Sequence, residues 1–376
     1  MTFSRSKPCR GCSASRPVGC RGIRVDRNTI VLRKSRWVVP VRRSRPTARA
    51  AGLLLGYAAD RLFADPKRWH PVAGFGLAAM RLEQRTYADS RLSGAAHVVV
   101  LVGATAAGGA IAQRLGARCG WAGEAAVTAA ATWTVLGGTS LAGAGRTMAR
   151  HLEADDMAAA RALLPSLCGR DPSVLDADGI ARATLESVAE NTSDAAVGAL
   201  FWGAVAGVPG LLAYRASNTL DAMIGYRSAK YNRFGWAAAR WDDLVNFVPA
   251  RLTGVLTVAA APTAGGSASG AVSAWWRDAS NHPSPNAGVA EASTAGALGI
   301  QLGGRTEYAH GIEMRPTLGS GPAPDVADLE RAARLSSIVQ AGAAVTAAVL
   351  ALAVGRRRRY PRGVGGFARW CGGLLP

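Results

Sequence analysis

Long intervals without charged side chains dominate the pattern of hydrophobic and polar positions along the chain. Five intervals of at least 20 residues contain no Asp, Glu, Lys or Arg, and they are residues 92–113, 125–145, 195–214, 252–276 and 335–355. A helix needs about 20 apolar residues to cross roughly 30 Å of hydrocarbon. Four intervals meet this requirement, whereas the interval 252–276 is firmly apolar only over 252–262. The pattern predicts an all-α fold, namely a polytopic helical integral membrane protein with helical extramembrane loops.

A large soluble helical enzyme with buried Ala-rich helices is the alternative, but five such intervals exceed what soluble cores usually contain. Two details refine the membrane interpretation. The shorter apolar segment Ala50–Ala59 ends at Asp60, so we expect it only to touch the membrane. Pro209 and Gly210 lie late in the interval 195–214, where they can kink that helix or make it re-entrant.

The net charge of +19 belongs to the two ends of the chain. Residues 1–49 hold 14 basic residues and one acidic residue, and residues 355–376 hold six arginines and no acidic residue. The rest is neutral, which argues against nucleic-acid binding, because that function needs basic residues clustered on a folded face. We expect a disordered basic N-terminal extension over 1–48, a membrane-embedded domain over 49–355 and a basic C-terminal tail over 356–376.

Residues 60–72 read DRLFADPKRWHPV and contain two X–Pro pairs. Asp65-Pro66 and His70-Pro71 form a rigid turn, because each proline fixes its own φ and moves the preceding residue out of the α region. Such a turn would hold a carboxylate and an imidazole in fixed positions. A plain interfacial turn anchored by an aromatic residue is the alternative, and on spacing alone we favour it.

Residues 176–194 read DADGIARATLESVAENTSD and place three carboxylates on one helical stripe. Glu186, Glu190 and Asp194 follow the spacing i, i+4, i+8, where like charges repel, and only Arg182, four residues before Glu186, offers relief. A bound Mg²⁺ would explain the stripe, because carboxylates and substrate phosphates usually hold this ion together. A solvated acidic helix whose polar end caps the next helix is an equally good explanation.

Residues 215–251 combine acidic and amide side chains with a basic, aromatic loop. Asn218 and Asp221 share one helix face, and Gly225 opens the loop. The loop then carries Arg227, Lys230 and Arg233 interleaved with Tyr226 and Tyr231. The next helix places Asp242 and Asp243 against Asn246 and is expected to end near Pro249 and Arg251. This combination suits a metal-bound polyphosphate, whereas a positive-inside loop with interfacial tyrosines is the alternative.

Residues 281–291 read NHPSPNAGVAE and predict a helix start. Ser284 as the N-cap and Pro285 as the first helical residue leave Asn286 and Glu291 on the first turns. Backbone N–H groups there point at any anion. Taken alone, the segment is better explained as a cap with no further role.

The four segments together resemble the CobD/CbiB family of cobalamin biosynthesis, the adenosylcobinamide-phosphate synthases. The resemblance covers about residues 48–355 and rests on the motifs DPKRWHPV, ESVAENTSDAAVGALFW, YRASNTLDAMIGYRSAKYNRFGWAAARWDDLVNFVPARLT and HPSPNAGVAEASTAGALGIQLGG, in that order. No Walker A, strand-borne GxGxxG, HExxH or GxSxG motif is present, so an ATP-using protein with this sequence is not a P-loop protein.

The resemblance implies an integral membrane enzyme that forms an amide at the expense of ATP. A side-chain carboxylate of adenosylcobyric acid would join the amine of aminopropanol or aminopropanol phosphate, giving adenosylcobinamide or its phosphate. ATP and Mg²⁺ would serve as substrate and activating ion, without a tightly bound cofactor. The resemblance further implies a multi-pass protein of the cell membrane. Its partners would be the lipid bilayer and late cobalamin pathway enzymes, and no nucleic acid.

This chemistry suggests roles for the residues of the four segments. Activation of a carboxylate as an acyl phosphate needs charge neutralisation around the phosphates, and the attacking amine must lose a proton to a base. We expect catalytic roles for His70, Glu190, Asp194 and Asp221. We expect Mg²⁺ to be held by Glu186, Glu190, Asp242 and Asp243. We expect substrate to be bound by Asn191, Asn218, Arg227, Lys230, Asn246, Arg251 and Asn286.

A non-catalytic corrinoid permease or a scaffold for late cobalamin enzymes remains as a second class of function. A permease should place its polar residues within spanning helices, whereas here the charged clusters lie between the apolar intervals. Topology leaves a question open. If every interval spans once, residues 147–193 and 216–250 lie on opposite sides of the membrane, unless 195–214 is re-entrant around Pro209. Residues 356–359, all arginine, predict a cytoplasmic C-terminus.

Overall fold

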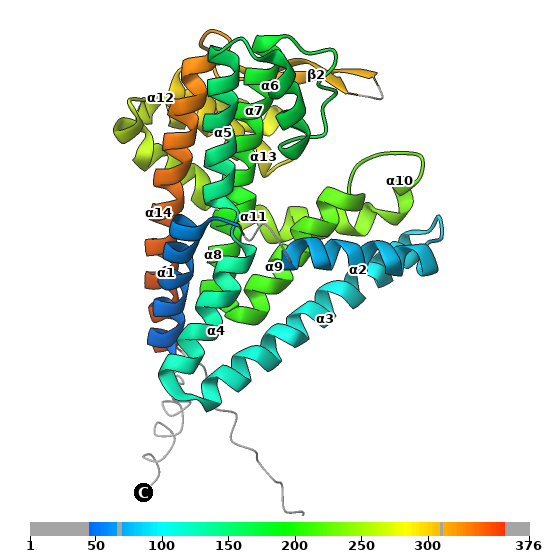
Figure 1. Cartoon of the computed structure of the whole chain (residues 1–376), viewed down its shortest axis with the longest axis vertical. Coiled ribbons are helices and arrows are strands. Elements are labelled where there is room, and N and C mark those ends of the chain that lie inside the picture. The colour runs from blue at the N-terminus through cyan, green and yellow to red at the C-terminus, as the bar shows by residue number, and fades with distance from the viewer. Residues whose placement is uncertain (1–44, 66–69, 309–310, 358–376) are drawn as a thin grey trace, which may run out of the picture. The chain divides into compact units, whose positions relative to one another are not determined.

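The computed structural model describes residues 45–65, 70–308 and 311–357. Within these residues the chain is almost entirely helical with one β-hairpin, so the predicted all-α class is confirmed. The expected disordered extension, up to residue 44, and the expected tail, from residue 358, lie outside the described residues. Figure 1 shows how the helices are arranged.

The elements follow one another in three parts of the chain. The first part forms α1 (Pro46–Phe63), α2 (Pro71–Thr86), α3 (Arg91–Arg118), α4 (Gly120–Val135), α5 (Gly138–Glu153), α6 (Met157–Leu163) and the 3₁₀ turn η1 (Leu164–Ser166). The second part forms α7 (Ala177–Asn191), the π-helical segment η2 (Thr192–Val197), α8 (Gly198–Ala206), α9 (Val208–Ile224), α10 (Tyr231–Phe234), α11 (Trp236–Ala260) and η3 (Ala261–Ala264). The last part forms α12 (Ala268–Asp278), η4 (Ala279–Asn281), α13 (Ala287–Leu298), the antiparallel strands β1 (Leu302–Tyr308) and β2 (Gly311–Leu318), and α14 (Val326–Arg357).

Three segments of the described chain are long and apolar enough to cross a membrane. They are Arg91–Arg118, Tyr231–Ala264 and Val326–Gly355. The other two intervals predicted to span, 125–145 and 195–214, are each divided into two helices. The structure therefore agrees with a helical membrane protein but offers fewer single-helix spans than the sequence pattern predicts.

α1 continues past Asp60, the acidic residue at which its apolar segment ends. The helix begins at Pro46, where a missing N–H costs nothing, and runs through Asp60 to Phe63. Asp60 is buried, and its Oδ2 accepts hydrogen bonds from the backbone N–H and the hydroxyl of Thr139, at 3.1 and 2.8 Å. The helix continues although the apolar segment ends at Asp60, because a partner on α5 satisfies the carboxylate inside the protein. The expectation that this segment only touches the membrane stays a prediction.

The interval 125–145 is divided at the point where α5 begins and contacts α14. α4 ends at Val135, and α5 begins at Gly138. A Cβ atom at Gly138 would collide with the side chain of Gln340 on α14, and Gln340 Nε2 donates to the Gly138 carbonyl at 3.2 Å. Any larger residue at 138 would require the Gln340 side chain to move, so this contact between helices distant in sequence favours glycine.

The interval 195–214 reverses direction at Gly207. This residue has φ +74°, a conformation that favours glycine, and α9 begins directly after it with Pro209 in its first turn. The two helices then run back along each other: a Cβ at Gly203 would meet Leu211, and one at Gly198 would meet Tyr214. The segment is thus a helical hairpin, as the re-entrant alternative requires, and both of its ends lie at the same level of the protein.

α11 continues through Pro249, whereas the sequence analysis expected it to end there. Proline at this position cannot donate to the carbonyl of Val245, four residues earlier. The indole N–H of Trp202 on α8 donates to that carbonyl instead, at 2.9 Å. The tertiary contact removes the main cost of an internal proline, so the helix extends to Ala260.

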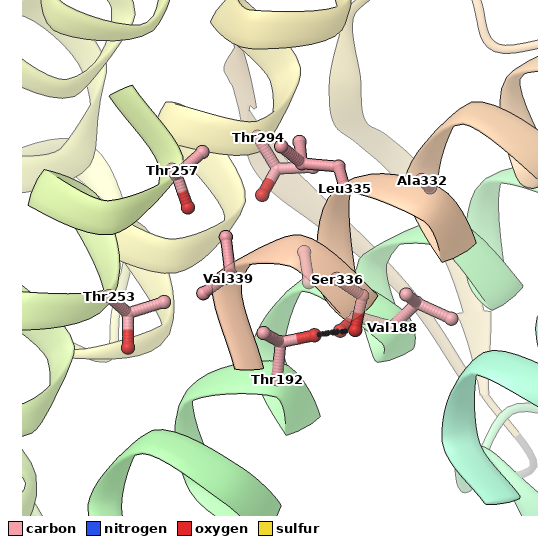
Figure 2. A pocket seen from close by; sticks show the side chains of 10 residues that line it. Val188, Thr192, Thr253, Thr257, Thr294, Ala332, Leu335, Ser336 and Val339 are labelled. Atoms are coloured by element: carbon pink, nitrogen blue, oxygen red, sulfur yellow. Dashed lines mark hydrogen bonds between the residues drawn. The ribbon is translucent and has the colours of Figure 1, made fainter. Parts of the chain in front are cut away.

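The helix that carries the acidic stripe changes its winding at the π segment. α7, η2 and α8 follow one another without a gap from Ala177 to Ala206. The hydroxyl of Thr192, in the π segment, lies 2.6 Å from that of Ser336 on α14, as Figure 2 shows. The small cavity beside this pair has a volume of about 10 Å³ and is lined partly by threonine hydroxyls, including those of Thr253 and Thr294. Hydroxyl pairing thus fixes the position of the π segment against α14.

The two ends of α14 meet different parts of the molecule. Ser336 lies beside the π segment, whereas Gly355 packs against Pro46 at the start of α1. Nineteen residues separate Ser336 from Gly355, which is about 29 Å of helix and close to the thickness of the hydrocarbon core. The π segment and the basic ends of the described chain therefore lie about one membrane thickness apart along α14.

Candidate functional site

Several acidic residues predicted from the sequence, joined by residues from distant segments, gather into two neighbouring groups at the π segment. We call the first the carboxylate cluster, and it consists of Asp194, Asp221, Asp242 and Asp243. We call the second the ion network, and it consists of Arg170, Glu186, His282, Glu291 and Arg315. Glu190 lies between the two groups. Its charge raises the pKa of Asp194 and of Asp221 in the carboxylate cluster, and its own pKa responds to the charges of Arg315 and Glu186 in the ion network.

The reversal at Gly207 brings two sequence motifs together in the carboxylate cluster. Asn218 Nδ2, on α9, donates to Asp194 Oδ2, in the π segment, at 3.2 Å. The hydroxyl of Tyr214 lies 3.0 Å from the carbonyl oxygen of Asp194 and 2.6 Å from Asn246 Oδ1. Asn246 Nδ2 in turn donates to Asp242 Oδ2 at 2.8 Å. The hydrogen bonds therefore connect η2, α9 and α11 across the site.

The carboxylates of this cluster are crowded, and their crowding changes their acidity. Burial, and then the negative charges of Asp242 and Glu190, hold the pKa of Asp194 well above its ordinary value. Burial, and then the charges of Asp243 and Glu190, raise the pKa of Asp221 to about 6. Groups with a pKa near the working pH suit proton transfer, so Asp221 has the acidity of a general base.

One carboxylate oxygen of the cluster has no partner. Asp242 is buried, and its Oδ1 makes no hydrogen bond among the described residues. Such an oxygen suits a hard cation such as Mg²⁺. Within the described part of the chain, no three His, Cys, Asp or Glu side chains form a ready metal site. Magnesium is usually held by one or two carboxylates together with substrate phosphates.

The ion network holds Glu186 in place through contacts far away in the sequence. The Glu186 carboxylate pairs with the buried guanidinium of Arg170, and its Oε1 accepts from the backbone N–H of Gly303 at 2.8 Å. Arg315 Nη1, on β2, lies 3.7 Å from Glu186 Oε2. The expectation that only Arg182 relieves the acidic stripe is wrong. The loop after α6 and the β-hairpin, both distant in sequence, supply the compensating charge.

His282 is a neutral imidazole in this network, and its tautomer follows from its partners. Arg315 Nη2 lies 2.8 Å from His282 Nε2. A guanidinium can only donate, so Nε2 accepts and carries no proton, whereas Nδ1 lies 3.0 Å from the carbonyl oxygen and 3.1 Å from the backbone nitrogen of Ser284. Burial, and then the charge of Arg315, lower the pKa of His282, in agreement with a neutral ring.

Glu291 is the most deeply enclosed acid of the ion network. It is 1% exposed, its Oε1 lies 3.7 Å from His282 Nε2, and that oxygen has no hydrogen-bond partner among the described residues. Burial, and then the charges of Glu186 and Glu190, raise the pKa of Glu291 well above its ordinary value. Its surroundings therefore disfavour the charged form of Glu291.

A cavity of about 420 Å³ opens beside the carboxylate cluster, and we call it the arginine cavity. Asp243 belongs to its wall. The other charged and aromatic residues of the wall are Arg91, Arg227, Arg233, Arg240, Tyr226, Tyr231 and Trp236. Arginine recognises phosphate through paired N–H donors, so the cavity suits a polyphosphate ligand.

Two of the predicted residues bind within the protein in ways that the sequence pattern did not show. Lys230 does not line the arginine cavity, because its Nζ pairs with Glu83 Oε1 of α2 at 2.6 Å. Asn191 Nδ2 donates to the backbone oxygen of Ser187 at 2.9 Å. These contacts explain how the side chains are held, and the substrate-binding roles expected for Lys230 and Asn191 stay predictions.

His70 lies near the cluster but is not in contact with it. Its Nδ1 accepts from the backbone N–H of Val72 at 3.2 Å and so caps α2. Its Nε2 lies 3.8 Å from Asp65 Oδ1. The charge of Asp65 acts on Arg215, whose Nη1 donates to Asn218 Oδ1 at 3.3 Å. His70 is thus linked to the carboxylate cluster through Asp65 and an arginine. The role of this His as a proton carrier stays a prediction.

The segment 281–291 starts its helix two residues later than expected. α13 begins at Ala287 with Asn286 as its N-cap, and Ser284 Oγ accepts from the N–H of Ala287 at 3.2 Å. Asn286 joins two parts of the site: its Oδ1 accepts from Arg251 Nη1 at 2.7 Å, and its Nδ2 donates to the backbone oxygen of Asp243 at 2.8 Å. The position of Asn286 is therefore set by α11.

Several residues of the ion network, of the surroundings of the carboxylate cluster and of the wall of the arginine cavity were not assigned a role from the sequence. They are Arg91, Arg170, Tyr214, Arg215, Arg240, His282, Glu291 and Arg315. His282 precedes a proline just as His70 does, and this repeated His-Pro pair was a usable signal. The arginines carried no such signal, because their partners are distant in sequence.

Comparison with known proteins identifies the family. The profile described as CobD/Cbib protein matches residues 53–336, a range that includes both polar groups. The chain belongs to the CobD/CbiB family. A Mycobacterium tuberculosis protein named cobalamin biosynthesis protein CobD is 61% identical over 310 residues, which cover 82% of this chain and 97% of that protein.

More distant relatives of this family member carry the same name. The Rhodobacter capsulatus protein is 42% identical over 287 residues, which cover 75% of this chain and 90% of its own length. The Geobacter metallireducens protein is 41% identical over 278 residues, which cover 73% and 87%. No solved structure matches the chain. The resemblance noted from the four motifs is thus confirmed by the family profile and by relatives from distant bacteria.

Proposed function

We propose that the protein acts in cobalamin biosynthesis as an ATP-dependent amide-forming ligase. It would join the amine of aminopropanol or aminopropanol phosphate to a side-chain carboxylate of adenosylcobyric acid. The names of its relatives refer to cobalamin biosynthesis. The ligase chemistry is what the family resemblance implies, and the residues of the site suit it. The observation that carries it is the position of Asp243, which belongs both to the carboxylate cluster and to the wall of the arginine cavity.

The arginine cavity would hold the triphosphate. Arg227, Arg233 and Arg240 can donate to phosphate oxygens, and Trp236 offers an aromatic face, over which Arg91 is already stacked at 5.3 Å. Mg²⁺, when bound, would neutralise charge on the phosphates, and Asp242 and Asp243 are the residues placed to hold it. The unpartnered Oδ1 of Asp242 supports this assignment.

The reaction needs two displacements. A carboxylate oxygen of adenosylcobyric acid attacks the terminal phosphorus of ATP, ADP leaves, and an acyl phosphate forms. The amine nitrogen then attacks the acyl carbon, and inorganic phosphate leaves. The nitrogen loses a proton in this step, and Asp221, with its pKa near 6, is the group best suited to accept it. Asn218 and Asn246 keep the neighbouring carboxylates in place through their hydrogen bonds.

Turnover by the purified protein tests the proposal. The detergent-solubilised protein is mixed with adenosylcobyric acid, ATP, Mg²⁺ and aminopropanol phosphate, and the amide product and ADP are measured in the same sample. We expect one ADP for each amide formed, and no amide when ATP is omitted. Binding of adenosylcobyric acid without any amide product in the complete mixture would instead support a permease or a scaffold.

A further inference from the structure

A second cavity, of about 410 Å³, lies beside the arginine cavity and is aromatic rather than basic. We call it the tryptophan cavity, and its wall includes Arg251, Trp275, Trp276, His282, Pro283 and Pro285. Its volume is nearly the same, but its two tryptophans and its single arginine distinguish it from the arginine cavity, which has four arginines.

The two indoles of the tryptophan cavity are held differently. Trp275 packs its ring against the backbone of α11 at Gly254, where a Cβ atom would lie 2.7 Å from Trp275 Cζ3. Trp276 is the opposite case, because it is 81% exposed and its ring is free to cover a ligand. A fixed aromatic wall next to an exposed indole suits a large, flat ligand that enters from the surface.

The tryptophan cavity adjoins the site of the proposed reaction. Pro283 lines both cavities. Asn286 crosses the boundary between them, because it accepts from Arg251 on one side and donates to the backbone of Asp243 on the other. A ligand in the tryptophan cavity therefore has its inner edge next to the wall that carries Asp243.

Arg251 gives this cavity a polar anchor. Its Nη1 donates to Asn286 Oδ1 and to the backbone oxygen of Phe247, and its guanidinium lies 3.9 Å from the centre of the Phe247 ring. Its Nε and Nη2 donate to no group within the described ranges, so they remain available for a carboxylate or an amide oxygen of a ligand. The stacking on Phe247 fixes the plane of the guanidinium.

We propose that the tryptophan cavity binds one edge of the corrin ring of the substrate, with Arg251 donating to one of its side arms. The inference rests on the proposed function. A volume of about 410 Å³ cannot enclose a whole corrinoid, so the ring is held by one edge and Trp276 covers its face. The side arm that reacts then points across Pro283 toward the phosphates in the arginine cavity.

Binding of adenosylcobyric acid to the full-length protein in lipid nanodiscs tests this assignment. Two variants change the cavity in opposite ways. Trp276→Ala removes the exposed indole, whereas Ser280→Trp adds an indole at an exposed position of the wall and fills the cavity. Trp121→Ala is the matched control, because Trp121 is also exposed (44%) and lies on α4. We expect the corrinoid Kd to rise about tenfold or more in the two cavity variants and to stay unchanged in the control, while the ATP Kd stays unchanged in all three.

The outcomes separate the two proposals. If the wild type forms the amide but both cavity variants keep the normal corrinoid Kd, the corrin edge binds elsewhere and only this inference fails. If the wild type neither binds the corrinoid nor turns it over, the proposed function itself fails. A parallel loss of ATP affinity in the cavity variants would show a structural disturbance and overturn the assignment. A drop in membrane insertion with normal corrinoid affinity would identify Trp276 as a lipid anchor and would also overturn it.

Discussion

Asn218 donates a hydrogen bond to Asp194 across the two arms of a helical hairpin, at 3.2 Å, although 24 residues separate them in the sequence. This contact depends on the reversal at Gly207, which has φ +74°. A straight helix over residues 195–214 would place the two side chains about 36 Å apart. The hairpin therefore brings residues of two separate sequence motifs together in one site.

The hairpin leads to a prediction about membrane topology. With the native cysteines replaced except Cys119, Ser166→Cys and Ala229→Cys should react with an impermeant thiol reagent from the same side of the membrane. Cys119 lies at the C-terminal end of α3, whereas Arg91 at the N-terminal end lines the arginine cavity. The exposed thiol of Cys119 should therefore react from the side of the membrane opposite to positions 166 and 229. Labelling of positions 166 and 229 from opposite sides would show that residues 195–214 cross the membrane.

The same labelling fixes the orientation of the protein. ATP is cytosolic, so the proposed function requires positions 166 and 229 to face the cytoplasm. The start of α1 and the end of α14 lie about one membrane thickness away along α14, and the proposed function therefore places them on the opposite side. The arginines of residues 356–359 favour the reverse orientation by the positive-inside rule. Cytoplasmic labelling of Cys119 alone would contradict the proposed function.

The contact between Trp202 and Val245 leads to a prediction about stability. Trp202→Phe leaves a buried carbonyl without a donor and should lower the free energy of unfolding by about 1–3 kcal/mol. Pro249→Ala restores a backbone N–H four residues after Val245. In the Pro249→Ala variant, Trp202→Phe should therefore lower the free energy of unfolding by clearly less than in the wild type. Chemical denaturation in a constant detergent gives the four stabilities of this cycle. Equal costs in both backgrounds would mean that the indole does not replace the missing backbone donor.

The raised pKa of Asp221 leads to two predictions: activity should increase with pH, whereas the contribution of Asp221 to stability should decrease with pH. If Asp221 is the base, kcat/KM should increase as the pH rises through about 6, and Asp221→Asn should lower activity about 10²-fold to 10⁴-fold. Stability should change the other way. A carboxyl with a folded-state pKa above its ordinary value of 3.8 favours folding in its protonated form. That contribution is therefore present below about pH 4 and is lost as the pH rises to about 6.

Asp221→Asn serves as the test of both, because it should weaken the pH dependence of stability as well as that of the rate. Thermal unfolding and initial rates are measured from pH 4.5 to 8 for both proteins. An unchanged rate profile in the variant would assign the proton transfer to another group, with His70 next in line.

Glu190 should matter for activity but not for folding. Glu190→Gln removes one charge between the two polar groups and should reduce turnover about 100-fold or more, with partial recovery at high Mg²⁺. Thermal stability should be kept or raised, because burial disfavours the charged form of Glu190. Glu153→Gln is the matched control, since Glu153 is an exposed acid at the end of α5. Near-normal turnover in Glu190→Gln would remove this acid from the active site.

The sequence predicted the fold class and the four segments that form the site, because apolar intervals and motifs are local patterns. It did not predict features that depend on distant partners. Pro249 was expected to end its helix, and only Trp202, 47 residues earlier, allows the helix to continue. Lys230 was expected to bind phosphate, and its pairing with Glu83 depends on how α2 packs. No spacing rule reveals such contacts, since each is created by folding.

The acyl phosphate is the central claim, and an isotope experiment tests it most directly. Adenosylcobyric acid labelled with ¹⁸O in the reacting carboxylate is converted to the amide with unlabelled ATP, and the inorganic phosphate is analysed by mass spectrometry. The account predicts that one ¹⁸O enters inorganic phosphate for each amide formed, with ADP as the other product, because the acyl oxygen leaves with the phosphate. Unlabelled phosphate, label in AMP, or amide formation without ATP would contradict it.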